Sequence, residues 1–453
     1  MPKHIVILGN GISGITCARH IRKRSDHRIT VISGETDHFF SRTALMYIYM
    51  GHMKFEQTKP YEDWFWEKNR IELERAWIEK IDTAGKKLIS SDEREFSYDQ
   101  LVLATGSKPN KFDWPGQDLP GVQGLYSYQD LESLEDSTTN HKISRGVIVG
   151  GGLIGIEMAE MLASRNIPVT MLVREESYWN NALPPRESAL VTRHIQKHGI
   201  DLRLDSELAR IEEGPNGRAA AVHTKDGKRI ECQVVGLTAG VSPNIGFLEA
   251  TDIETQRGIM IDRSFRTNVQ DVFAIGDCAQ FREPLPGRRP IEQVWYTGRE
   301  HGLTLARTLT GNAADQPEEY NPGPWFNSAK FIDIEWHTYG NVLPRMSDEF
   351  KSLYWEHPEK EICVHMVYRT DNKEFVGINS MGIRYRHLIF DRFLRENRKM
   401  EYVLENLGAA NFDPEFFKQY EEDVVGAWNK QEGDNLKLKR RRGLRGVLEL
   451  LKV

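Results

Sequence analysis

Short apolar runs, each followed by a turn and a helical stretch, recur along the first two thirds of the chain. The run 5–8 leads through three glycines into a helical stretch at 15–24, and the run 146–149 leads through a second glycine turn into 156–164. Short buried strands alternating with helices are typical of α/β proteins with parallel sheets. Further buried strands are predicted at 28–32, 101–104, 169–173, 234–238 and 272–275.

The last third follows a different pattern. Residues 319–430 contain no glycine fingerprint and are rich in aromatic side chains. Alternation of apolar and polar positions at 330–336 and 361–368 predicts antiparallel strands, and the pattern at 389–406 predicts a helix. An α+β C-terminal domain is therefore expected.

Length and composition describe a globular chain. Its 453 residues suffice for two or three domains, and 39% hydrophobic with 28% charged residues is ordinary for that class. The chain has no run of about 18 apolar residues that could cross a bilayer. Residues 1–4 pass into the first strand without a signal-type apolar segment, so a cytoplasmic location is expected.

The charge is unevenly distributed. The formal net charge is −6, but residues 437–453 hold seven Lys or Arg against one Glu, so the rest of the chain carries −12. This basic tail suits anionic lipid at the inner face of a membrane or an acidic electron carrier, and a solvated tail is the alternative. Nucleic acid is a poor fit because the body of the chain is acidic.

The four cysteines, at 17, 232, 278 and 363, are too scattered for a disulfide framework or a zinc site. They are expected to be buried thiols that pack as small hydrophobes. No Ser-His-Asp arrangement and no metal site is expected elsewhere in the chain.

The first glycine turn has the spacing of a dinucleotide fingerprint. Gly9 permits the tight turn, Gly11 lets the backbone approach a pyrophosphate, and Gly14 lets the helix pack closely on the strand. Glu35 follows the next predicted strand, 21 positions after Gly14, where a carboxylate can accept hydrogen bonds from a ribose. An ordinary loop glutamate is the alternative for Glu35.

The second glycine turn repeats this arrangement with Gly150, Gly152 and Gly155. Two fingerprints in matching strand-turn-helix contexts predict two nucleotide sites in one chain. At the end of the following strand, Arg174 matches a 2′-phosphate and favours NADPH, while Glu175 leaves NADH open.

The first fingerprint and the segments 101–107 and 271–277 together resemble the motifs of the flavoprotein pyridine nucleotide-disulfide oxidoreductases. The resemblance covers about residues 1–310. The resemblance implies an N-terminal FAD fingerprint, an inserted NAD(P)H domain and a Gly-Asp motif that closes the flavin site. It places Asp277 on the ribityl chain of FAD, and Thr105 and Gly106 beside its ADP half. Gly240 lies where the family's chain returns to the FAD domain.

Many members of the family use a reactive cysteine beside the flavin, and here Thr43 stands at that place. Disulfide reduction is therefore not expected, because it requires a thiol. The resemblance brings Arg42 to the FAD pyrophosphate, with a surface arginine as the alternative. It also places Trp295 over the flavin or in the electron exit route. Packing in the protein core is the alternative for Trp295.

The same resemblance puts the carboxylate of Glu157 near the nicotinamide and flavin rings, as a catalytic candidate. Tyr47 stands where several relatives carry the lysine that pairs with this carboxylate, so the sequence departs from the family's ion pair at this place. A favourable interaction of Glu157 with the helix dipole would explain its position equally well.

The predicted architecture is α/β, with two Rossmann-like dinucleotide-binding domains and an α+β C-terminal domain. The predicted boundaries are 1–112 and 241–318 for the FAD domain, 113–240 for the NAD(P) domain, 319–430 for the C-terminal domain and 431–453 for the basic tail.

The expected activity is FAD-dependent oxidation of NAD(P)H, with electrons leaving the flavin directly for an acceptor protein such as a ferredoxin or rubredoxin. The alternatives are a redox-sensing flavoprotein of the apoptosis-inducing-factor type, and an NADH oxidase or quinone reductase. A homodimer is a further option.

Overall fold

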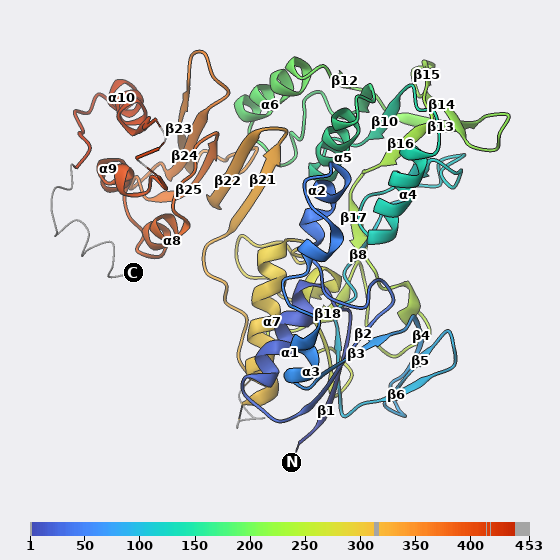
Figure 1. Ribbon diagram of the computed structural model, residues 1–453. Helices are drawn as coiled ribbons and strands as arrows, with labels where there is room; N and C mark the ends of the chain where they lie inside the picture. Colours follow the sequence, from blue (N-terminus) through green and yellow to red (C-terminus); the bar gives the residue numbers. More distant parts are fainter. Residues whose placement is uncertain (1, 312–316, 414, 417, 440–453) are drawn as a thin grey trace. The chain divides into compact units, whose positions relative to one another are not determined.

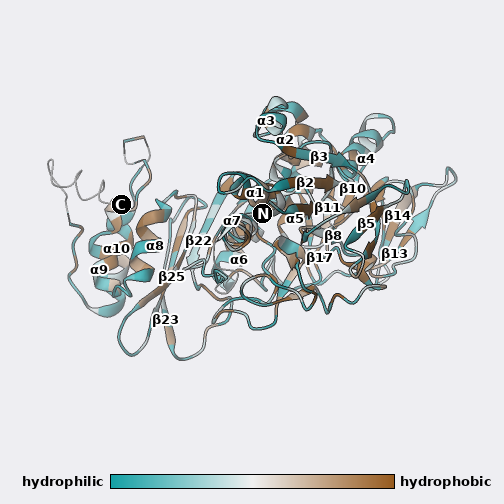
Figure 2. Ribbon diagram, turned by 90° about the horizontal axis from the view of Figure 1, so that it is seen from below, coloured by the Kyte–Doolittle hydropathy of each residue, from teal (hydrophilic) through white to brown (hydrophobic). Residues whose placement is uncertain are grey.

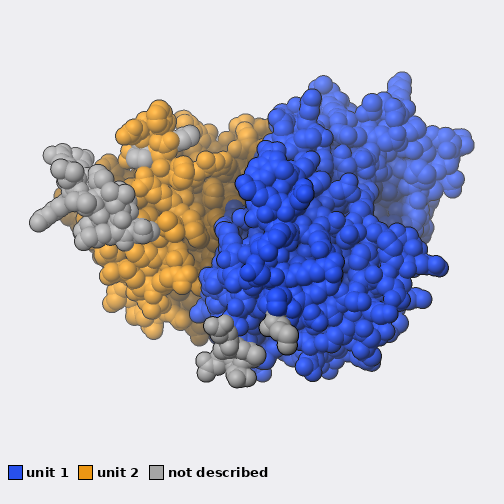
Figure 3. Space-filling model, turned by 60° about the horizontal axis from the view of Figure 1, so that its bottom comes forward, with its two compact units in different colours: residues 1–172, 206–322 blue, residues 173–205, 323–453 orange. Residues whose placement is uncertain are grey.

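The computed structural model describes residues 2–311, 317–413, 415–416 and 418–439. The chain forms two compact units, coloured separately in Figure 3. Unit 1 consists of residues 1–172 and 206–322, and unit 2 of residues 173–205 and 323–453.

A parallel sheet near the N-terminus organises the first part of unit 1 (Figure 1). Its strand order is β19-β7-β1-β2-β3. Helix α1 (Ile12–Arg22) packs against α7 (Trp295–Thr310) so closely that a Cβ at Gly302 would lie 2.4 Å from the backbone oxygen of Ser13. The strands are β19 (Val272–Ala274), β7 (Gln100–Leu103), β1 (His4–Leu8), β2 (Arg28–Ser33) and β3 (Ile71–Arg75).

A second parallel sheet in unit 1 carries β11, β10, β16 and β9 side by side. Strands β10 (Gly146–Val149), β11 (Val169–Leu172) and β16 (Val234–Leu237) are buried at every position, and β10 and β11 carry the hydrophobic colour of Figure 2. Strand β9 (Val122–Gln123) lies at one edge, and α5 (Leu153–Ser164) follows β10. Both sheets confirm the predicted α/β class.

The rest of unit 1 consists of short connecting elements. Two small antiparallel sheets are β4-β5-β6 and β13-β14-β15, and two strand pairs are β8-β17 and β18-β20. Their strands are β4 (Ile78–Asp82), β5 (Lys87–Ser90), β6 (Glu95–Ser97), β13 (Leu208–Glu213), β14 (Ala219–Thr224), β15 (Arg229–Glu231), β8 (Ser107–Pro109), β17 (Val241–Pro243), β18 (Ile259–Ile261) and β20 (Ala279–Phe281). The helices are α2 (Leu45–Tyr49), α3 (Trp64–Lys68), α4 (Tyr128–Thr139), η1 (Arg42–Ala44), η2 (Phe55–Thr58), η3 (Gly246–Leu248) and η4 (Gly276–Cys278).

Unit 2 is built on one antiparallel sheet of order β21-β22-β25-β24-β23. Its apolar core joins this sheet to the C-terminal helices and contains Phe390, Trp428 and Met366, each fully buried. The strands are β21 (Phe326–Phe331), β22 (Ile334–Gly340), β23 (Phe350–Glu356), β24 (Cys363–Arg369) and β25 (Phe375–Met381), with β12 (Asp201–Arg203) in the same unit. The helices are α6 (Pro185–Lys197), α8 (His387–Arg395), α9 (Met400–Glu405), α10 (Glu421–Glu432) and η5 (Leu407–Ala409).

Two predictions for this part of the chain were wrong. The stretch 330–336 is not one strand, because Ile332 takes a φ of +61° and turns the chain between β21 and β22. The stretch 389–406 is two helices, because Asn397 takes a φ of +49° and the carbonyl of Arg398 accepts a hydrogen bond from Phe375. Both interruptions occur without glycine or proline, the residues that usually mark them.

The basic segment is described only in part. Lys439 pairs with Glu405 at 2.7 Å, and Leu438 packs against the core of unit 2. The rest of the predicted tail, residues 440–453, lies outside the described residues. The predicted domain boundaries at 112 and 240 lie within unit 1 and stay a prediction. No helix among the described residues is long and apolar enough to span a membrane.

Candidate nucleotide and flavin site

The first glycine of each fingerprint makes the same turn. Gly9 has a φ of +117° and Gly150 a φ of +124°, a region that favours glycine. A Cβ would lie 2.1 Å from the backbone oxygen of Ala104 at Gly9, and 2.6 Å from that of Thr238 at Gly150. At both positions the neighbouring strand therefore leaves no room for a side chain.

The third glycine of each fingerprint sits where the helix crosses that turn. A Cβ at Gly14 would lie 2.1 Å from the backbone oxygen of Gly9, and one at Gly155 would lie 2.5 Å from that of Gly150. Close helix-strand packing is the role that the sequence predicts for both residues.

The middle glycines differ from the other four. Gly11 and Gly152 are the N-cap residues of α1 and α5, and no side chain of the described chain caps either helix. A Cβ at either position would meet no described atom within 4 Å. A helix N-terminus with space in front of its N-cap glycine suits a pyrophosphate, so both turns fit a dinucleotide.

Glu35 and Arg42 form a two-point ion pair beside the first turn. The guanidinium reaches the two carboxylate oxygens at 2.8 and 2.5 Å, and the backbone N–H of Tyr128 donates to Glu35 at 2.9 Å. Arg42 also donates to the carbonyl of Tyr126 and lies 4.6 Å from the centre of that ring. Neither residue is an isolated surface charge, and their roles toward FAD stay predictions.

Asp277 lies at the end of a short chain of hydroxyl groups. The hydroxyls of Ser107 and Tyr126 lie 3.2 and 3.3 Å from its Oδ2, and the Tyr126 hydroxyl accepts from the backbone N–H of Ser107. Burial raises the pKa of Asp277, although Ser107 and the positive charge of Arg42 oppose that shift. Because both hydroxyl contacts fall on Oδ2, Oδ1 is the oxygen that remains for the predicted ribityl contact.

A buried polar network stands behind Asp277. His301 accepts a hydrogen bond from the backbone N–H of Gly276 through Nδ1, at 3.1 Å. Its Nε2 lies 3.8 Å from Glu292, which also accepts from the hydroxyl of Tyr320 at 2.7 Å and faces Arg288. The network fixes the turn that carries Asp277.

The strand ends near these groups are tied to one another. Thr105 donates to the carbonyl of Asn244 at 2.9 Å, and the N–H of Asn244 donates to Gly106. Gly106 and Gly240 have φ values of +67° and +88°. The turn after β7 is thus joined to the return of the chain at 240–244.

The predicted redox contacts lie at helix starts. Trp295 opens α7, half-buried, with its ring edge-on to Tyr296 at 5.4 Å. Glu157 is half-buried and is the fifth residue of α5, so it stands in the second turn of that helix. Tyr47 lies in α2, where its ring stacks on His52.

The residues predicted to choose between NADH and NADPH lie in unit 2. The guanidinium of Arg174 is exposed and donates to the carboxylate of Glu175 at 2.9 Å. The backbone carbonyl of Glu175 accepts from Asp205, which fixes the strand end. The guanidinium of Arg174 therefore lies at the surface, where the carboxylate of its neighbour partly neutralises its charge.

All four cysteines lie among the described residues, and each is a buried, unpaired thiol. Burial raises the pKa of Cys17, of Cys278 and of Cys363, and raises the pKa of Cys232 to about 12. Thr43, at the position of the family's thiol, is exposed, and its hydroxyl lies 3.2 Å from the hydroxyl of Ser41. Thiolate chemistry has no suitable residue here.

Sequence reasoning missed Tyr126, Ser107, His301 and Glu292. Tyr126 stands 151 residues from Asp277 in the chain, and no local motif marks it. Glu292 lies just before α7 and His301 lies within it, and the burial of both side chains was not visible from the pattern of apolar and polar positions.

Comparison with known proteins agrees with this geometry. The pattern of the pyridine nucleotide-disulphide oxidoreductase family matches residues 3–302. Rhodocoxin reductase of Rhodococcus erythropolis is 29% identical over 332 residues, covering 72% of this chain and 76% of that protein. The assimilatory nitrate reductase electron transfer subunit of Bacillus subtilis (strain 168) is 27% identical over 344 residues, and the matched region spans 75% of this chain but only 43% of that longer protein.

Among solved structures, the ferredoxin reductase for the CYP199A2 system from Rhodopseudomonas palustris has the same fold. The TM-score is 0.76 at 22% identity, covering 94% of this chain and 99% of that one. The family match spans the two fingerprints, the turn at 104–106 and the Gly-Asp motif. The chain therefore belongs to the pyridine nucleotide-disulphide oxidoreductase family and is an FAD-dependent NAD(P)H oxidoreductase.

Proposed function

We propose that this oxidoreductase passes electrons from NAD(P)H, by way of FAD, directly to an external electron-acceptor protein of the ferredoxin or rubredoxin class. The observation that carries the proposal is the state of the four thiols. Each is buried, and none stands at the family's position beside the flavin. Relatives named as reductases of small redox proteins, such as rhodocoxin reductase, support the same class of acceptor.

The residues of the chain would divide the work between binding and positioning. The backbone at Gly11 and Gly152 would hold the two pyrophosphates, and Arg42 with Glu35 would hold the ADP half of FAD. Asp277 would accept from the ribityl chain, with His301 fixing its turn. When bound, FAD supplies the conversion of a hydride donor into a source of single electrons.

Glu157 is the side chain proposed nearest the reacting rings. Its place in the second turn of α5 lies beyond the strongest part of the helix dipole, whose effect is confined to the first turn. The helix-dipole alternative is weakened by that position. A carboxylate there would orient the nicotinamide, and excluding water and aligning the rings would complete the catalytic task.

The experiment is anaerobic reduction of the purified flavoprotein by NADH and by NADPH in a stopped-flow instrument. The reduced protein is then mixed with a ferredoxin, a rubredoxin, a quinone or oxygen. Fastest reoxidation by one of the two redox proteins supports the proposal. A reduced nicotinamide complex that persists with all four acceptors contradicts it and favours the redox sensor, and fastest reoxidation by oxygen or the quinone favours those acceptors.

A thiol control separates this route from cysteine chemistry. The folded protein is treated with N-ethylmaleimide before the acceptor reaction. Because the four thiols are buried with raised pKa, electron transfer is expected to be unchanged. Loss of transfer in step with alkylation of one cysteine would contradict the direct route.

The location and assembly of the protein are part of the same proposal. We propose a cytoplasmic enzyme whose basic segment 437–453 contacts the acidic face of its acceptor, with contact at the inner face of a membrane as the other outcome. Removing residues 440–453 should slow acceptor reduction at low salt and leave flavin reduction unchanged. Binding of the full chain to anionic vesicles, if it is lost in the truncated chain, would favour contact of this segment with a membrane. Analytical sedimentation tests separately whether the protein is a homodimer.

A further inference from the structure

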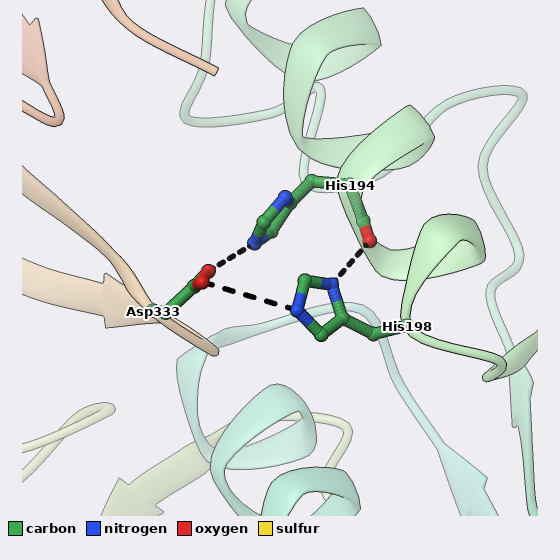
Figure 4. A group of neighbouring side chains, drawn as sticks. All are labelled: His194, His198 and Asp333. Atoms are coloured by element: carbon green, nitrogen blue, oxygen red, sulfur yellow. Dashed lines mark hydrogen bonds and ion pairs between the residues drawn. The ribbon is translucent and has the colours of Figure 1, made fainter. Parts of the chain in front are cut away.

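A cluster of two histidines and an aspartate lies in unit 2, apart from the residues assigned above (Figure 4). His194 lies in α6, His198 caps the C-terminus of that helix, and Asp333 lies in the turn between β21 and β22. The two histidines are four positions apart and share one helix face, with ring centres 4.3 Å apart. One ligand-type atom from each of the three side chains lies within 4.8 Å of the others.

The carboxylate of Asp333 faces the Nε2 atoms of both rings. It lies 2.5 Å from Nε2 of His194 and 3.9 Å from Nε2 of His198. The second distance is too long for a hydrogen bond. Two ligands of a tetrahedral Zn²⁺ ion lie about 3.3–3.6 Å apart, since each bond is about 2.0–2.2 Å long, so a shift of a few tenths of an ångström would bring this pair into range.

The tautomer of His198 is set by its other nitrogen. Nδ1 donates to the backbone carbonyl of His194 at 3.0 Å, which leaves the lone pair on Nε2, directed at Asp333. Metal-binding histidines typically donate their second N–H to a carbonyl or carboxylate in this way. His194 is buried, and its Nδ1 has no hydrogen-bond partner among the described residues, so Nε2 makes the polar contact of that ring.

The turn that presents Asp333 is conformationally unusual. Ile332 has a φ of +61° in a two-residue hairpin loop, at a position where such loops take glycine. A β-branched residue rarely adopts this region. Such strain persists where the surrounding structure requires it, often at binding sites.

Nearby charges leave the cluster available to a cation. Lys197, between the two histidines in sequence, pairs with Glu361 at 2.6 Å. Arg193 pairs with Glu356 at 2.6 Å. The positive side chains next to the cluster along α6 thus have acidic partners of their own.

We propose that His194, His198 and Asp333 bind one divalent transition-metal ion, for which Zn²⁺ is the representative. Two imidazoles and one carboxylate suit Zn²⁺ and its neighbours in the first row, and they do not suit Mg²⁺ or Ca²⁺, which prefer oxygen ligands. The ion replaces the His194–Asp333 hydrogen bond, and a water completes the fourth position. It ties α6 to the β21–β22 turn, and the exposed side chain of Asp333 has room to rotate toward it.

The test is calorimetric titration of the chelator-treated holoenzyme with Zn²⁺ alone. One equivalent per chain is expected to bind, and saturation should raise the melting temperature by about 2 °C or more. His198→Gln and Asp333→Asn should each weaken the affinity about tenfold or more. Both side chains are at the surface, so these variants should keep their flavin absorbance and near-UV circular dichroism spectrum.

His223→Gln is the matched control. His223 also contacts a carboxylate, Glu212, at 2.6 Å, but it has arginines and not a second imidazole beside it. This variant should bind Zn²⁺ as the wild type does. Equal affinities in the wild type and His198→Gln, or an equal loss in His223→Gln, would overturn the proposal, as would binding of Mg²⁺ with the same affinity.

Discussion

The guanidinium of Arg42 holds both carboxylate oxygens of Glu35, at 2.8 and 2.5 Å, seven residues apart in the chain. The two side chains are 29% and 20% exposed, so water screens the pair only in part. Arg42→Ala should weaken FAD binding about tenfold or more, because it removes charge-assisted hydrogen bonds and leaves Glu35 without its partner. Flavin release followed by fluorescence measures the effect.

Arg28→Ala is the control for that prediction. Arg28 makes a similar two-point contact with Glu72, but the side chains are 63% and 45% exposed. Surface pairs of this kind contribute about 0–1 kcal/mol. FAD affinity should therefore stay at the wild-type value in Arg28→Ala, and a similar loss in both variants would argue against a specific role for Arg42.

Gly11 and Gly9 should respond differently to alanine. A methyl group at Gly11 meets no described atom within 4 Å, so Gly11→Ala should fold normally yet bind FAD poorly, because the methyl occupies the approach of the pyrophosphate. In Gly9→Ala the new methyl group would clash with the backbone oxygen of Ala104, and alanine would be forced into a φ of +117°. This variant should therefore lose about 1–3 kcal/mol of folding stability. Thermal unfolding and flavin content separate the two effects. Full FAD content in Gly11→Ala would refute the assignment.

Arg174→Ala should raise KM for NADPH about tenfold and leave KM for NADH nearly unchanged. The reason is that the exposed guanidinium can bind the 2′-phosphate, which NADPH has and NADH lacks. Glu175→Ala should have the opposite preference, because it frees Arg174 and removes an acceptor for ribose hydroxyls. Steady-state kinetics with both nucleotides measures the two variants. Parallel changes with NADH and NADPH would place selectivity elsewhere.

Glu157→Ala should slow flavin reduction about tenfold without loss of FAD, because the proposed role of the carboxylate is to align the nicotinamide. Stopped-flow absorbance under anaerobic conditions gives the rate. Glu160→Ala, three residues further along α5, is the matched control and should reduce at the wild-type rate. An unchanged rate in Glu157→Ala removes this residue from the mechanism.

Glu292 should make folding stability depend on acid pH. Burial alone would raise its pKa, but contacts with His301, Arg288 and Tyr320 lower it below the ordinary value of 4.5. A lowered folded-state pKa adds stability above the unfolded-state pKa, and that stability is lost as the pH falls below about 4.5 through the folded-state pKa. Glu292→Gln should lose about 1–3 kcal/mol at neutral pH. It should also show a shallower decline in acid, measured by urea unfolding from pH 6 to 3.

Sequence patterns located the nucleotide-binding parts well. Strand β10 has the predicted bounds, and β1 and β2 differ from theirs by one residue each. These strands are buried at nearly every position and each is closely followed by a glycine, so local composition and tertiary burial agree. The roles of Gly9 and Gly14 followed from the same local rule.

The rest depended on contacts that the chain makes at long range. Tyr126 reaches Asp277 across 151 positions, and Asp333 reaches His194 across 139, so no window of sequence contains either pair. The turn at Ile332 and the break at Asn397 have positive φ values at residues that are not glycine. Tertiary packing imposes the conformation of Ile332, which the local propensity of a β-branched residue opposes.

The open space at Gly11 and at Gly152 has an implication for redesign of this enzyme. Since the two cradles are alike at their centres, neither distinguishes a flavin from a pyridine nucleotide by what it offers the diphosphate. We expect discrimination to come from the side chains that follow the next strand in sequence, for which the predictions are Glu35 after the first fingerprint and Arg174 after the second. Coenzyme preference should therefore be exchangeable by grafting a few peripheral positions, with both glycine loops left intact.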